Sequence, residues 1–127
     1  MTDVVLDSSA ILATLFGEPG GEIARAAMKR ACLSAVNFTE VVTKLIDQGL
    51  TSMEAQDSID RLGCELMDVD KYRATSAGAL HARTQRTGIS LGDRFCLSLA
   101  SELGLPVLTT DRRWKTLDLG VEVTLIR

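Results

Sequence analysis

The stretch Val4-Val5-Leu6-Asp7-Ser8-Ser9-Ala10-Ile11-Leu12 joins a short apolar run to an apolar helical pattern through a single acidic residue. Residues 4–6 predict a buried strand, because the run is short, apolar and rich in β-branched side chains. Residues 8–16 predict a helix that ends at the glycine- and proline-rich segment 17–21. A buried strand that leads directly into a helix favours a parallel α/β fold.

The same alternation continues to the end of the chain. Further strands are predicted at 32–36, 64–67, 107–109 and about 121–125. Helices are predicted from the 17–21 break to about residue 30, and then at 38–46, 51–63, 71–86 and 90–103. Strands separated by helices predict one α/β domain over residues 1–127, with a Rossmann-like parallel sheet of about five strands and helices on both faces.

The composition excludes several classes of protein. The chain has 127 residues, 46% apolar and 24% charged, which is typical of a folded domain and not of a disordered or fibrous protein. No apolar stretch approaches the roughly 18 residues that cross a membrane, and the first residues lack the basic region of a signal peptide. Three cysteines without CxxC spacing predict reduced thiols, so we expect a cytoplasmic protein without membrane contact.

The charge is unevenly distributed along the chain. Residues 1–70 contain twelve acidic and five basic side chains, whereas residues 71–127 contain five acidic and nine basic ones. A basic half on an acidic protein is typical of a surface that faces a polyanion. The alternative is a solvated helix face, and charge alone does not decide between the two.

Four carboxylates fall where the predicted sheet would gather them. Asp7 follows the first strand and Asp111 follows the fourth. Glu40 lies in the first turn of the helix after the second strand, and Asp93 in the first turn of the 90–103 helix. Ligands of open parallel sheets bind beyond the carboxyl ends of the strands. Each acid also has a structural interpretation. Asp7 and Asp111 suit helix N-caps, and Ser90-x-x-Asp93 and Asn37-x-x-Glu40 resemble capping boxes.

Taken together, the four acids predict a metal site. Neighbouring carboxylates without partners repel one another, and a divalent cation relieves that repulsion. An all-oxygen ligand set favours Mg²⁺ or Mn²⁺ over zinc, and carboxylate-bound metals commonly activate water for phosphoryl chemistry. The hydroxyls of Ser8, Ser9 and Thr109 are placed to orient the carboxylates or to bond locally.

Four motifs in this order resemble the PIN-domain ribonucleases, and most closely their VapC-type toxins. They are VVLDSSAIL at 4–12, SAVNFTEVV at 34–42, ISLGDRFCLSLA at 89–100 and PVLTTDRRW at 106–114, so the resemblance covers essentially the whole chain. It implies that Asp7, Glu40, Asp93 and Asp111 bind Mg²⁺ or Mn²⁺. It also implies that Asn37, Thr109 and either Ser8 or Ser9 support them.

The resemblance further implies an activity and partners. The expected activity is metal-dependent endonucleolytic cleavage of RNA, leaving 5′-phosphate and 3′-hydroxyl ends. The expected partners are a second copy of the chain, as a homodimer, and a small antitoxin protein whose tail enters the active-site groove.

Recognition of RNA is expected to rest on phosphate contacts. With only five aromatic residues in the chain, a stacking platform for bases is not expected. Arg86, Arg112 and Arg113 are the predicted phosphate contacts. Trp114 is read as a packing residue. The alternative function is a non-catalytic α/β binding module that uses the acidic rim for protein contacts.

Overall fold

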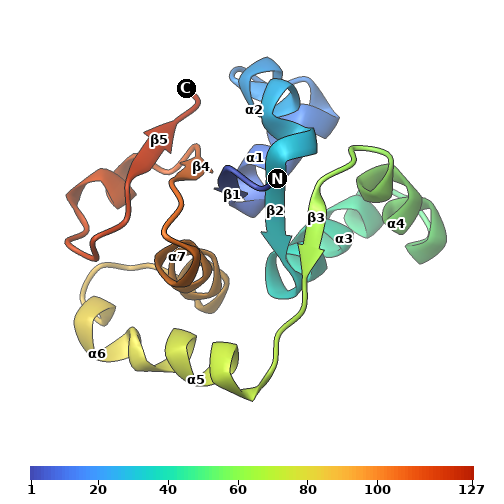
Figure 1. Ribbon diagram of the computed structural model, residues 1–127. Coiled ribbons are helices and arrows are strands. Elements are labelled where there is room, and N and C mark those ends of the chain that lie inside the picture. The colour runs from blue at the N-terminus through green and yellow to red at the C-terminus, as the bar shows by residue number, and fades with distance from the viewer.

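The computed structural model describes all 127 residues, and its centre is one parallel sheet. The strands are β1 (Val4–Leu6), β2 (Ala31–Ser34), β3 (Glu65–Met67), β4 (Val107–Thr109) and β5 (Val123–Leu125). Their order across the sheet is β3-β2-β1-β4-β5, and every neighbouring pair is parallel (Figure 1). The five-stranded parallel α/β fold expected from the sequence is therefore confirmed.

Helices cover both faces of the sheet because strand residues alternate between the two faces. The helices are α1 (Ser8–Phe16), α2 (Gly21–Ala27), α3 (Ala35–Asp47), α4 (Ser52–Asp60), α5 (Lys71–Ala79), α6 (His81–Thr84) and α7 (Leu91–Leu103), with short 3₁₀ helices η1 (Met28–Arg30) and η2 (Arg112–Thr116). Val4 and Leu6 point into a core with α1 to α4, whereas Val5 points into a second core with α7. In Figure 1, α5 and α6 lie beyond α7, on the side of α7 away from the sheet.

Several predicted boundaries differ from the structure, and two of the differences have a local cause. The second strand ends at Ser34 and not at 36, because Ser34 caps α3 by accepting a hydrogen bond from the Val36 amide. The predicted helix over 71–86 is divided into α5 and α6 at Leu80. Gly78 weakens the last turn of α5, and a glycine there costs about 1 kcal/mol relative to alanine. No helix is long and apolar enough to cross a membrane.

The strand order positions the candidate site. The chain passes from β1 to β2 and β3 on one side, and then crosses to β4 on the other side of β1. The carboxyl ends of β1 and β4 therefore lie next to each other at the point where the order reverses, which is the usual ligand site of such sheets. The Asp7 amide donates to the Leu108 carbonyl at 3.0 Å, which ties the two strand ends together.

Candidate active site

Asp7 is the most buried of the four carboxylates. It leaves β1 at the N-cap position of α1, but its side chain makes no capping hydrogen bond. Its Oδ2 instead accepts from the Ser9 hydroxyl at 2.7 Å and the Thr109 hydroxyl at 2.9 Å. Its Oδ1 is buried and has no hydrogen-bond partner. A buried carboxylate oxygen without a donor is costly, so this atom is suited to accept a ligand.

The environment of Asp7 opposes ionisation. Burial raises its pKa from 3.8 to about 6, the hydroxyls of Ser9 and Thr109 oppose the rise, and the charges of Asp93 and Glu40 add to it. Asp93 and Glu40 therefore each lie within electrostatic range of Asp7. A cation placed among them would favour the ionised form.

Glu40 is held by a buried asparagine. Asn37 is fully buried on α3, and its amide donates to Glu40 Oε1 at 2.8 Å and to the Gly92 carbonyl at 3.0 Å. The helix begins at Ala35, so the predicted Asn37-x-x-Glu40 capping box is wrong. Asn37 does support Glu40, and it links α3 to the start of α7. A Cβ on Gly92 would overlap the Glu40 carboxylate, so a larger residue there would displace that carboxylate.

Asp93 caps its own helix. Its Oδ2 accepts from the Ser90 amide at 2.8 Å, while the Ser90 hydroxyl accepts from the Asp93 amide at 3.2 Å, so the predicted capping box is confirmed. The capping bond uses only one carboxylate oxygen, because no hydrogen bond reaches Oδ1. The cap therefore leaves Asp93 free to contribute the other oxygen to a ligand.

Asp111 is linked to Asp7 through Thr109. The Thr109 hydroxyl that donates to Asp7 also accepts from the Asp111 amide at 3.0 Å. The Asp111 side chain accepts from the Arg113 amide at 3.0 Å, as an N-cap of η2. The Arg113 guanidinium also donates to both oxygens, from Nε to Oδ1 at 3.0 Å and from Nη2 to Oδ2 at 2.6 Å. These hydrogen bonds lower the pKa of Asp111.

Of the two serines expected to support Asp7, Ser9 contacts it and Ser8 does not. Ser9 bonds Asp7 and also accepts from the Thr110 amide at 3.0 Å, so it joins β1 to the loop after β4. Ser8 opens α1 and its hydroxyl makes no hydrogen bond. The sequence analysis did not single out Gly92. The signal available there was a poor helix former in the first turn of a helix, directly before an acid.

The donor set suits a hard divalent cation. The available atoms are carboxylate oxygens, and one of them, Asp7 Oδ1, is buried without a partner. No three carboxylates lie close enough to share one ion in this structure. Asp7 and Asp111 follow the neighbouring strands β1 and β4, Glu40 and Asp93 lie on α3 and α7, and Asp111 forms an ion pair with Arg113.

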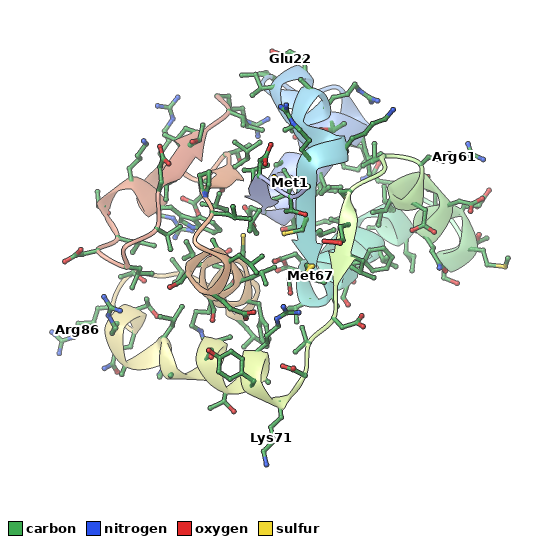
Figure 2. The ribbon with its side chains drawn as sticks, in the orientation of Figure 1. Met1, Glu22, Arg61, Met67, Lys71 and Arg86 are labelled. Atoms are coloured by element: carbon green, nitrogen blue, oxygen red, sulfur yellow. The ribbon has the colours of Figure 1, made fainter.

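The basic residues divide into structural and free ones. Several from the basic half bond the protein itself: Arg73 pairs with Glu102, Arg83 donates to the Asp118 carbonyl and Arg94 to the Ala77 carbonyl. Arg86 and Arg112 are exposed, and Figure 2 shows Arg86 extending away from the ribbon beside α6. Trp114 is fully buried, as predicted for a packing residue.

Comparison with solved structures shows the same fold in toxin–antitoxin complexes. One is the DNA-bound VapBC complex of Salmonella typhimurium, with 20% identity, 100% of both chains covered and a TM-score of 0.78. A toxin–antitoxin complex from Klebsiella pneumoniae has 16% identity, with 98% of both chains covered and a TM-score of 0.75. VapBC-5 of Mycobacterium tuberculosis has 20% identity, with 100% of this chain and 99% of the other covered and a TM-score of 0.59. No curated protein sequence matches.

A sequence model of one family also matches. The model of the PIN domain covers residues 4–119, which include all four acids and the strands that carry or precede them. Because that match spans most of the chain and the likeness of fold spans all of it, the resemblance drawn from the four motifs is confirmed, and the protein belongs to the PIN domain family.

Proposed function

We propose that this PIN domain is a Mg²⁺- or Mn²⁺-dependent endoribonuclease and the toxin of a type II, VapBC-type toxin–antitoxin pair that acts on cytoplasmic RNA. The observation that carries the proposal is the Asp7 carboxylate. It is buried at the point where the strand order reverses, with one oxygen unpartnered and with Glu40 and Asp93 in electrostatic range. A structural aspartate would satisfy both oxygens or lie at the surface.

Asp7, Glu40, Asp93 and Asp111 would hold the metal. When bound, Mg²⁺ or Mn²⁺ activates water and stabilises charge on the phosphate in an in-line displacement. The protein supplies orientation: Ser9 and Thr109 fix the Asp7 carboxylate, and Asn37 fixes Glu40. Arg86 and Arg112 bind phosphates beside the site and give affinity without reading bases. The products carry 5′-phosphate and 3′-hydroxyl ends.

The partners follow from the same family. The matching structures from Salmonella and Klebsiella are complexes with an antitoxin, and we infer a small antitoxin and a homodimer for this chain as well. Support comes from α3 and α4, where Ile46 is 47% and Met53 is 79% exposed. Large apolar side chains exposed on neighbouring helices are typical of a protein contact. Light scattering at micromolar concentration, with and without antitoxin, tests this; a monomer in both would contradict it.

The decisive experiment compares two isosteric variants on structured RNA. Glu40→Gln removes one charge from the acidic rim, so cleavage with Mn²⁺ should fall by more than the roughly 10–100-fold typical of an outer-shell partner. Glu22→Gln, an exposed acid on α2, is the matched control and should cleave like the wild type. Mapping of 5′ ends then gives the cut site. RNA that stays intact with wild-type protein and Mn²⁺ would instead support the non-catalytic binding module.

A further inference from the structure

Only one of the four carboxylates is paired with a basic side chain. Asp111 is bound by Arg113 through both of its oxygens, whereas Asp7, Glu40 and Asp93 form no salt bridge. Arg113 is anchored on its other side as well, where Nη1 donates to the Gly88 carbonyl at 3.4 Å. The guanidinium thus connects η2 to the loop that precedes α7.

This ion pair competes with a metal for the same atoms. A carboxylate whose two oxygens both accept from a guanidinium has little capacity left for a cation, and the arginine adds a positive charge where the cation must bind. The pair is also accessible, because the Arg113 side chain is 58% and the Asp111 side chain 23% exposed. A phosphate that arrives from solvent can reach Arg113 and replace the carboxylate with an equally good bidentate partner.

We propose that Arg113 is a positioning residue that holds Asp111 out of the acidic cluster, and that the metal centre is completed when Arg113 exchanges Asp111 for an RNA phosphate. The inference rests on the proposed nuclease function and adds regulation by substrate to it. By linkage, RNA that removes Arg113 raises metal affinity, and bound metal raises RNA affinity by the same factor.

Trp114 supplies a second, independent observation. Its ring is fully buried and its amide donates to the Asp111 carbonyl at 3.2 Å, yet its indole Nε1 has no hydrogen-bond partner. A buried indole N–H normally finds an acceptor. A carboxylate released by Arg113 can become that acceptor. Trp114 is the only tryptophan in the chain, so tryptophan fluorescence reports on the surroundings of this one residue.

The test measures metal affinity without RNA and without cleavage. Dissociation constants for Mn²⁺ are obtained from the electron paramagnetic resonance signal of the free ion, for wild type, Arg113→Gln and Arg112→Gln. Arg112 is the matched control, because it is exposed, adjacent and has the same charge but does not contact Asp111. Arg113→Gln should bind Mn²⁺ roughly two- to fivefold tighter, the range of exposed ion pairs, and Arg112→Gln should change it less.

A fluorescence titration with Mg²⁺ completes the test, since Mg²⁺ does not quench indole directly. Trp114 emission should change as Mg²⁺ saturates the wild type, and the change should be lost in Asp111→Asn. If Arg113→Gln binds Mn²⁺ no more tightly than Arg112→Gln does, the role of Arg113 is overturned while the nuclease proposal stays intact. Absence of Mn²⁺ binding to every protein, wild type included, would overturn the metal centre itself and with it the nuclease proposal.

Discussion

Replacement of Asp7 by asparagine should change how the stability of the metal-free protein depends on pH. Burial raises the Asp7 pKa from 3.8 to about 6, so the folded state binds a proton more tightly than the unfolded chain. The proton therefore stabilises the fold fully below pH 3.8, and this stabilisation is lost as the pH rises through 6. The difference of the two pKa values corresponds to about 3 kcal/mol between the protonated and ionised limits.

The measurable window lies between pH 5 and 7.5. The same two pKa values give the wild type about 1.4 kcal/mol more stability at the lower pH, or roughly 5 °C in Tm for a chain of this length. Asp7→Asn has no proton to bind and should lose this increment. The asparagine carbonyl keeps the bonds from Ser9 and Thr109, but its amide takes the place of the unpartnered Oδ1. That fixed cost is the same at both pH values and cancels.

Urea unfolding in EDTA at pH 5 and 7.5 gives the two free energies for each protein. Asp47→Asn, an exposed acid on α3, is the control and should keep the wild-type difference. If Asp7→Asn also keeps the wild-type difference between the two pH values, the buried Asp7 carboxylate is not the source of that difference, and its predicted effect on stability is refuted. At pH 7.5, Mn²⁺ should raise the free energy of unfolding of the wild type and not that of Asp7→Asn, because a cation that binds only the folded state stabilises the protein that binds it.

Three further changes test the contacts around the site. Gly92→Ala places a methyl group against the Glu40 carboxylate, so it should reduce both metal affinity and cleavage while thermal unfolding shows the fold intact. Ser9→Ala removes the donor to Asp7 and should reduce cleavage by roughly 10–100-fold, whereas Ser8→Ala should cleave like the wild type in the same assay. Arg112→Ala should weaken binding to all RNAs alike and reduce the salt dependence by about one unit, as measured by binding titrations at several salt concentrations.

Much of this architecture is accessible from the sequence because its signals are local. The buried runs of β1 and β4 are short and apolar, so their ends, and with them Asp7 and Thr109, could be located to the residue. The convergence of the acids follows from the rule that parallel strands share one carboxyl edge. What failed was local as well. The division at Leu80 follows Gly78, which weakens the last turn of α5 and which the prediction of one helix over 71–86 did not take into account.

The choice between Ser8 and Ser9 shows where sequence information ends. Both hydroxyls follow Asp7 directly, and the one that meets the carboxylate is decided by the backbone angles at Asp7, which fix the phase of α1. An extended residue followed at once by helix turns the side chain of Ser9, and not that of Ser8, toward Asp7 and Thr109. The contact of Gly92 with Glu40 is likewise a distance between α7 and α3, and it depends on the packing of the whole fold.

Asp93 shows that a structural and a functional interpretation of one residue need not compete. The capping box uses Oδ2 and stabilises the first turn of α7, which fixes the position of the carboxylate relative to the sheet. The charge of the same carboxylate contributes to the electrostatic field at Asp7. A side chain held by its own helix loses less entropy when it binds an ion than a mobile one does. Capping would therefore prepare Asp93 for the proposed metal, and acids in the first turns of helices at this edge of a parallel sheet are suited to both roles.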